Sequence, residues 1–285
     1  MNYRHAFHAG NFADVLKHAV LALVLKYLRL KNQPFRVIDT HAGIGLYDLG
    51  AEEAQRTGEW QYGIGRLLSE ESRSFPALED LAPYLEAVRA VRERDGAYAY
   101  PGSPLIAQHW LRDTDRMILN EKHPLDRPRL EAAIGRDRRI KILGLDGYVA
   151  LNAHVPPPER RGLVLIDPPF EDKQEFAALM RGFARAYAKW PTGTYLLWYP
   201  LKNPEQSVSF VEAIRSLDLP RCLRIEQAVR GHEPNGPLYG SGLIVVNPPY
   251  LLGAQMRALL PELTILLAQN QGAFWCCDWF GTTQE

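Results

Sequence analysis

The stretch FRVIDTHAGIG, residues 35–45, decides the fold class. Its apolar run reaches an acid, Asp39, and then enters a turn that holds two glycines. An apolar run bounded by a turn signal is typical of a buried strand. Three later stretches have the same form, an apolar run that leads to an acid: RMILNEKH (116–123), IKILGLDGY (140–148) and GLVLIDPPF (162–170). We therefore expect four short strands that each end in a loop carrying an acidic residue.

Helical patterns alternate with these strands. Asn11 and Asp14, followed by a periodic apolar run, predict a capped helix from about residue 12 to residue 31. Three more helical patterns follow the later strands: LDRPRLEAAIG (125–135), DKQEFAALMRGFARAYAKW (172–190) and NPEQSVSFVEAIRSL (203–217). Further strands are expected at TYLLWYPL (194–201), CLRIEQAV (222–229) and SGLIVVN (241–247). This alternation predicts an α/β fold, with a mostly parallel twisted sheet flanked by helices on both faces.

One gap between the predicted strands is too long for a simple crossover. Asp39 and Glu121 lie about eighty residues apart, whereas a compact strand-helix-strand unit takes about 30 residues. The segment 50–98 is charged and helical in pattern. We expect it to be a small helical insertion subdomain within one domain that is formed by residues 1–49 and 99–285.

The composition excludes several classes of protein. The formal net charge of the 285 residues is zero, so bulk charge does not hold this chain on nucleic acid. No apolar stretch is long enough for a membrane helix. The three cysteines form no CxxC motif and no disulfide framework, which favours the cytoplasm. The histidines lack the spacing of a metal site, and no metal is expected.

The acids at the strand ends indicate where a ligand binds. In an open parallel sheet, ligands bind beyond the carboxyl ends of the strands. Glu121 follows the strand after the glycine turn, where an acid can bind both ribose hydroxyls of an adenosine. The turn is not a GxGxxG motif, and the residues after Gly45 are acidic, so a pyrophosphate fits poorly. S-adenosyl-L-methionine therefore fits better than a dinucleotide, with Asp146 and Gly147 placed to meet the adenine.

The loop Asp167-Pro-Pro-Phe170 suits the methylation of an exocyclic amine. The Asp167 carboxylate and the carbonyl of Pro168 can both accept hydrogen bonds from an NH2 group, and prolines remove competing donors. Holding both hydrogens localises the nitrogen lone pair toward a methyl sulfonium, so that alignment supplies most of the acceleration. Asp167 is then the nearest acceptor for the proton that leaves. Phe170 offers a face on which a planar base can stack.

A second copy of this pattern, Asn247-Pro-Pro-Tyr250, is a rival for the same chemistry. It ends a late apolar run that we expect to be an edge or antiparallel strand, and its prolines can simply stop a strand. Asp167 instead ends the fourth run after the glycine turn, next to the expected cofactor site. The hypothesis therefore assigns the chemistry to Asp167.

These motifs, in this order, resemble a class I S-adenosylmethionine-dependent methyltransferase with a Rossmann-like fold. Over nearly the whole chain they more closely resemble the RlmJ family of bacterial 23S ribosomal RNA adenine-N6 methyltransferases. The resemblance rests on YRHAFHAGNFADVLKH (3–18), DTHAGIGLYDL (39–49), NEKHP (120–124), LDGY (145–148) and IDPPFE (166–171).

The resemblance implies roles for individual residues. Asp167 would be catalytic. The cofactor would contact His18, His41, Ser103, Glu121, Asp146, Gly147 and Asp167. The target base would lie near Tyr3, His5, Lys17, Pro168 and Phe170.

The resemblance also implies partners, and two other functions stay open. The partner would be 23S ribosomal RNA, free or in an assembly intermediate, bound by a cytoplasmic monomer without a membrane. A DNA adenine-N6 or protein-glutamine N5 methyltransferase could use the same loop, although glutamine enzymes favour Asn where this chain has Asp167. A non-catalytic RNA-binding scaffold is the second alternative.

Overall fold

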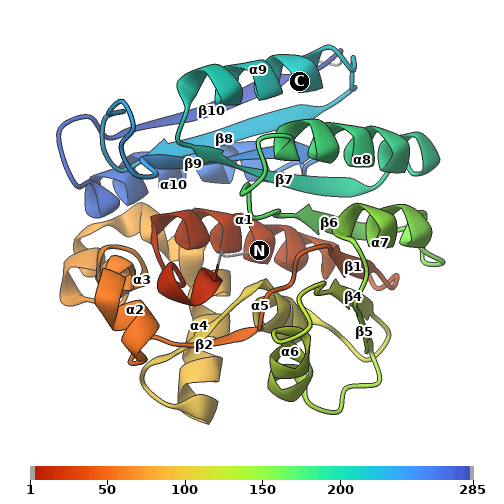
Figure 1. Ribbon diagram of the computed structural model, residues 1–285, viewed down its shortest axis with the longest axis horizontal. Helices are drawn as coiled ribbons and strands as arrows, with labels where there is room; N and C mark the ends of the chain where they lie inside the picture. The colour runs from red at the N-terminus through yellow and green to blue at the C-terminus, as the bar shows by residue number, and fades with distance from the viewer. Residues whose placement is uncertain (1–3, 283–285) are drawn as a thin grey trace.

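The computed structural model describes residues 4–282, and a central sheet organises this part of the chain (Figure 1). In the described residues the sheet has eight strands in the order β10-β8-β9-β7-β6-β1-β4-β5. Their bounds are β1 (Arg36–Asp39), β4 (Arg116–Asn120), β5 (Ile140–Leu143), β6 (Gly162–Ile166), β7 (Thr194–Leu201), β8 (Cys222–Ala228), β9 (Gly240–Val246) and β10 (Phe274–Phe280).

The sheet is parallel over the half that carries the acidic strand ends. Parallel pairs join β1 to β4 and β6, β4 to β5, and β6 to β7. Strand β9 runs antiparallel to both β7 and β8, and β10 runs antiparallel to β8. The prediction of a mostly parallel sheet is therefore confirmed, and the antiparallel strands of this central sheet all come from residues after 221.

Helices cover both faces of the sheet because alternate strand residues point to opposite sides. Val37 and Leu163 belong to one core cluster, whereas Ile38 and Val164 belong to the other. The second cluster is covered by α7 (Gly147–His154), α8 (Glu175–Lys189) and α9 (Pro204–Arg215). The first cluster is covered by α1 (Phe12–Leu28), α4 (Ala82–Asp95), α5 (Ser103–Trp110), α6 (Arg127–Ile134) and α10 (Leu252–Leu267).

Helix α1 crosses the middle of the molecule and is buried on almost all sides (Figure 1). Its first turn is capped by Asn11, whose side-chain oxygen accepts hydrogen bonds from the backbone N–H groups of Ala13 and Asp14. The helix ends at Leu28 rather than near residue 31, and Leu30 beyond it is exposed. The burial extends to polar residues in α1, which must find partners inside the protein.

The long segment between β1 and α5 begins and ends with two short strands that pair with each other. Strands β2 (Leu46–Asp48) and β3 (Ala99–Pro101) pair antiparallel on either side of it. Between them lie α2 (Glu52–Thr57), α3 (Ile64–Leu67), α4 and the 3₁₀ turns η2 (Glu59–Tyr62), η3 (Glu70–Ser74) and η4 (Pro76–Leu81). Buried side chains of this segment, Ile64 and Tyr84 among them, belong to the same core cluster as α1 and α10. Its treatment as a separate subdomain stays a prediction.

The predicted helices α6, α8 and α9 and the predicted strands β7, β8 and β9 are present within one to three residues of their expected bounds. Helices α5, α7 and α10 and strand β10 were not predicted. Helix α10 contains Pro261 in its interior, which normally interrupts a helix. Strand β10, FWCCDWF, lacks the alternation of a half-buried strand. Within the described residues, no helix is long and apolar enough to cross a bilayer.

Candidate active site

The parallel half of the sheet gathers the acidic strand ends at one edge. Adjacent strands β6, β1, β4 and β5 all run in the same direction, so their carboxyl ends lie side by side. Asp39 is the last residue of β1, Glu121 and Asp167 follow β4 and β6 directly, and Asp146 caps the helix after β5. The candidate site is this edge of the sheet, where ligands bind in open α/β folds.

Asn247, the first residue of the rival motif, lies at the opposite edge. Strand β9 runs antiparallel to β7, and its last residue, Val246, pairs with Tyr195 near the start of β7. The Asn247 side chain donates hydrogen bonds of 2.8 Å to the carbonyls of Pro191 and Gly193. Its φ of 52° is one that Asn tolerates better than most residues. Asn247 therefore fastens the loop before β7 and does not meet Asp167.

Asp167 is paired with a buried lysine. The ammonium nitrogen of Lys17, in α1, lies 2.6 Å from Oδ2 of Asp167 and 2.8 Å from Oδ1 of Asp14. The side chains of Lys17 and Asp14 are 6% and 1% exposed, whereas Asp167 is 18% exposed. Burial opposes the charge on Lys17, but the two carboxylates outweigh it and hold its pKa well above the ordinary value. Lys17 is therefore a permanent cation behind Asp167.

The second carboxylate of this group, Asp14, connects Lys17 to the start of the chain. Its Oδ2 accepts hydrogen bonds from His5 Nε2 and from the backbone N–H of Gly10, both at 2.9 Å. Burial disfavours the Asp14 anion, but His5 and Lys17 outweigh it and keep its pKa well below the ordinary value. The 3₁₀ turn η1 (His5–Phe7) is thereby tied to the site. Tyr3, predicted to lie near the target base, is outside the described residues.

Asp39, at the end of β1, is buried. Its carboxylate accepts a 2.7 Å hydrogen bond from the hydroxyl of Ser103 and a 3.2 Å bond from the backbone N–H of His41. Burial raises the pKa of Asp39 to about 6, and the charge of Asp167 adds to this effect. Ser103 is thus brought to the site through Asp39, as the first residue of α5.

Glu121 holds the glycine turn in place. Its Oε2 accepts a 2.8 Å hydrogen bond from the backbone N–H of Gly43, and its Oε1 accepts one of the same length from His123. Gly43 has a φ of 61°, a conformation that glycine adopts without steric cost. Burial raises the pKa of Glu121. The carboxylate of Glu121 therefore joins the turn after β1 to the segment that follows β4.

Asp146, Gly147 and His41 form the neighbouring wall. The Asp146 carboxylate caps α7 and also accepts from the exposed ammonium of Lys122 at 3.2 Å. A β-carbon on Gly147 would lie 2.5 Å from Nε2 of His41, so only glycine fits there. Burial lowers the pKa of His41 to about 4, which keeps its ring neutral. The predicted residues Asp146, Gly147 and His41 are therefore brought together.

His18 occupies a different place from the other predicted cofactor residues. It is only 1% exposed, and its Nδ1 is 2.8 Å from the hydroxyl of Tyr100. Tyr100 in turn lies 2.9 Å from the hydroxyl of Tyr84. Burial lowers the pKa of His18 to about 3, so the ring is neutral. The His18 side chain therefore lies in the protein core, and its contact with a cofactor stays a prediction.

The loop after β6 is braced by aromatic side chains. The ring of Phe170 lies 5.7 Å from Trp198 and 4.7 Å from Phe176, between centroids. Phe170 has a φ of 50°, an uncommon backbone conformation for a bulky residue. The ring that the sequence offered as a stacking face for a base is thus half-buried against two other rings. Its first effect is to fix the loop that carries Asp167 and Pro168.

Two polar contacts of the site were not foreseen in the sequence. The side-chain amide of Asn120 donates to the carbonyls of Thr40 and Leu145, and its oxygen accepts from the N–H of Leu145, all at 3.0 Å. Asn120 thereby clamps the glycine turn to the loop before α7. The hydroxyl of Tyr148 donates a 2.6 Å hydrogen bond to Glu175, which joins α7 to the start of α8. The sequence gives one indication of this role of Asn120, because a polar residue stands there at the end of an apolar run.

Known proteins are similar to this chain in sequence over almost their full length, and one solved structure is similar to it in fold. The family model described as "Ribosomal RNA large subunit methyltransferase D, RlmJ" matches residues 32–281. The chain is 39% identical to "Ribosomal RNA large subunit methyltransferase J" of Haemophilus influenzae, over 98% of each chain. It is 42% identical to the protein of the same description from Escherichia coli, over 92% of each. A crystal structure of a Legionella pneumophila protein, 31% identical, aligns with a TM-score of 0.84 over 97% of this chain and 100% of that one.

Proposed function

This chain belongs to the RlmJ family of ribosomal RNA large subunit methyltransferases, and from that membership we propose that Asp167 and the carbonyl of Pro168 hold the N6 amine of an adenine in 23S ribosomal RNA for methylation. The protein is a ribosomal RNA methyltransferase. Neither DNA, nor protein glutamine, nor a non-catalytic scaffold is favoured by relatives that are named for ribosomal RNA.

The ion pair of Asp167 supports its role as the acceptor of the amine. Lys17 occupies Oδ2, and among the described residues no group donates a hydrogen bond to Oδ1 or to the carbonyl of Pro168. These two oxygens can take the two hydrogens of an exocyclic NH2 group. The nitrogen lone pair then points away from the plane of the base, in the direction that attack requires.

Lys17 also defines what happens to the proton. Its ammonium occupies Oδ2 of Asp167, which leaves Oδ1 as the carboxylate oxygen that meets the amine. The methylated N6 is a cation until it loses a proton, and this N–H already donates a hydrogen bond to Oδ1 of Asp167. The proton passes from N6 to Oδ1 and then to water, because the Asp167 side chain is 18% exposed. We propose that Lys17 orients the carboxylate and that His5 and Asp14 hold Lys17.

The residues at the edge fit the cofactor of class I methyltransferases. S-adenosylmethionine, when bound, supplies the electrophilic methyl group. We propose that Glu121 accepts the ribose hydroxyls, since an acid at this strand end performs that task in related folds. Asp146 and Gly147 would meet the adenine, next to the neutral ring of His41. The glycine turn leads into strand β2 and not into a helix N-terminus, which fits a cofactor without a pyrophosphate.

Partners follow from the family and from the composition. We propose that a monomer acts in the cytoplasm on 23S ribosomal RNA, free or in an assembly intermediate. The formal net charge of zero supports recognition of a local RNA shape rather than capture by bulk charge. The target adenine must leave its stack to reach Asp167.

The observation that carries the proposal is the partly buried Lys17–Asp167 ion pair beside the Pro168 carbonyl. The test is transfer of labelled methyl from S-adenosylmethionine to 23S ribosomal RNA that lacks native methylation, followed by mapping of the modified nucleotide. Adenine-N6 methylation of RNA and not of DNA is expected, and Asp167→Ala should abolish it while the circular dichroism spectrum is kept. Full activity of the Asp167→Ala protein would reject the assignment.

A further inference from the structure

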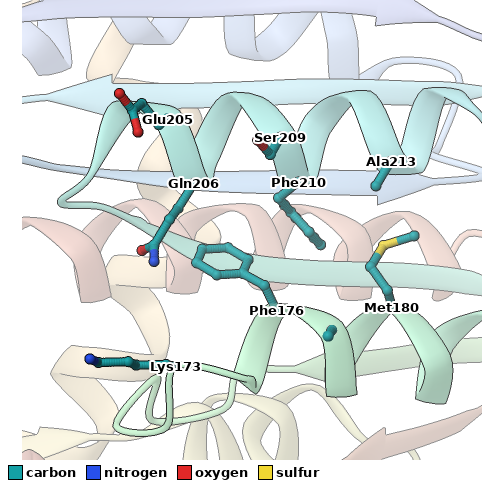
Figure 2. Close-up of a pocket in the computed structure, with 9 residues that line it drawn as sticks. Lys173, Phe176, Met180, Glu205, Gln206, Ser209, Phe210 and Ala213 are labelled. Atoms are coloured by element: carbon teal, nitrogen blue, oxygen red, sulfur yellow. The ribbon is translucent and has the colours of Figure 1, made fainter.

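A groove outside the site described so far opens between α8 and α9 (Figure 2). Its volume is about 420 Å³, within the range of about 300–1,000 Å³ that small-molecule sites occupy. Phe176 and Met180 rise into it from α8, and Phe210 points into it from α9. The lining residues are Lys173, Phe176, Ala177, Met180, Glu205, Gln206, Ser209, Phe210 and Ala213.

The groove opens at the same edge of the sheet as Asp167. Helix α8 follows β6 and α9 follows β7, and these two strands are parallel. The N-terminal turns of both helices therefore lie beside the loop that begins at Asp167. Lys173 belongs to that loop and Phe176 to the first turn of α8.

A continuous row of aromatic rings leads from that loop into the groove. The Phe176 ring lies 4.7 Å from Phe170 and 5.3 Å from Phe210, and Phe170 lies 5.7 Å from Trp198. Phe176 is therefore shared between the loop that carries Asp167 and the floor of the groove. A molecule that is held at Asp167 and continues along this edge meets the groove next.

The lining has the chemistry that an unstacked nucleobase needs. Its floor is aromatic and apolar, and single-stranded nucleic acid binds such floors by stacking. Its rim carries Lys173, Gln206 and Ser209, whose side chains make no hydrogen bond to any residue within 4–282. The amide of Gln206 can both donate to and accept from a base edge. Lys173 and Glu205 offset each other in charge, so the groove selects a base more than a phosphate.

We propose that this groove binds a base of the ribosomal RNA strand that flanks the target adenine, a proposal that rests on the proposed function. The flanking base leaves its stack together with the target and packs on the partly exposed ring of Phe176, which rests against the buried ring of Phe210. The groove is too small for a protein partner, because nine residues line it and a stable protein interface takes about 20–30 residues a side. It therefore contributes to the choice of the RNA site.

Filling the groove from α9 tests the proposal. Ser209→Trp places a large side chain in it, and Val208→Trp, at the neighbouring position that is 61% exposed and outside the lining, is the matched control. The KM for ribosomal RNA should rise about 5- to 100-fold in Ser209→Trp, the loss expected for one stacked base. The KM for S-adenosylmethionine should not change, and Val208→Trp should behave as wild type.

Cross-linking gives a readout that does not depend on folding of a variant. RNA with 5-iodouridine beside the target adenine should attach on irradiation to Phe176 of the wild-type protein, as peptide mass spectrometry detects. Equal KM values for the two Trp variants, or adducts only at other residues, would overturn the proposal. If the wild-type protein fails to methylate ribosomal RNA, the proposed function fails instead.

Discussion

Lys17 and Asp167 form a 2.6 Å ion pair although 150 residues of sequence separate them. The contact joins the buried helix α1 to the loop that follows β6, and it places a fixed cation behind the carboxylate of the proposed active site. It also makes the N-terminal segment part of the site, since Asp14 links Lys17 to His5.

Lys17→Met should reduce both activity and stability. The substitution leaves the buried Asp14 carboxylate and Asp167 without their common partner, which should lower the free energy of unfolding by about 3–5 kcal/mol. kcat should fall much more than KM for S-adenosylmethionine rises, because the orientation of Asp167 is lost. Urea unfolding and methyl transfer measure the two effects, with the exposed Lys26→Met in the same helix as control. A normal kcat in the folded variant would show that Lys17 serves stability only.

Asp39→Asn should change the pH dependence of stability. Burial raises the folded-state pKa of Asp39 to about 6, above its ordinary value near 3.8. The stability that this group contributes is therefore complete below about pH 4 and is lost as the pH rises through 6. The Asn variant cannot ionise, so relative to wild type it should gain about 1–3 kcal/mol at pH 8 and nothing near pH 4. Urea unfolding at both pH values measures this, and a difference that does not vary with pH would contradict it.

Tyr148→Phe should loosen the connection between the cofactor wall and the loop of Asp167. The hydroxyl donates to Glu175 at 2.6 Å, and its loss should lower kcat/KM by about tenfold, the equivalent of one hydrogen bond to a charged group. Tyr187→Phe is the matched control, because the Tyr187 hydroxyl has no hydrogen-bond partner among residues 4–282. Steady-state kinetics of both proteins give the answer, and equal losses would count against a specific role for Tyr148.

Asn247→Ala should reduce stability without reducing kcat. The substitution removes two hydrogen bonds, to Pro191 and Gly193, and places Ala at a φ of 52°, at a total cost of about 1–3 kcal/mol. Because Asn247 lies at the far edge of the sheet, methyl transfer below the melting temperature should match wild type. Loss of kcat in the folded variant would instead return the rival motif to consideration.

The sequence was most informative where local patterns and burial agree. The runs before Asp39, Glu121 and Asp167 are mostly apolar because both faces of their strands are covered, and this made the parallel half of the sheet predictable. Helix α10 was missed because Pro261 interrupts its pattern, and its burial is decided by contacts with distant elements. Propensity and periodicity carry no information about such contacts.

The candidate site was predictable as a set of residues but not as a network. The acids at the strand ends could be placed at one edge because parallel strands share a direction. The burial of Asp14, which shares Lys17 with Asp167, could not be predicted, because a polar residue in the first turn of a helix usually faces water. The Tyr148–Glu175 hydrogen bond likewise depends on how α7 packs against α8.

The antiparallel direction of β9 bears on how repeated four-residue motifs, such as those at Asp167 and Asn247, are interpreted in other proteins. The two similar tetrapeptides of this chain lie at opposite ends of the strands, because Asp167 follows β6, which is parallel to β7, whereas Asn247 follows β9, which is antiparallel to β7. A sequence search for this four-residue pattern alone would find both copies and would not distinguish them. Comparing the direction of each strand in the sheet therefore separates a copy at the proposed active site from a copy that fastens a loop.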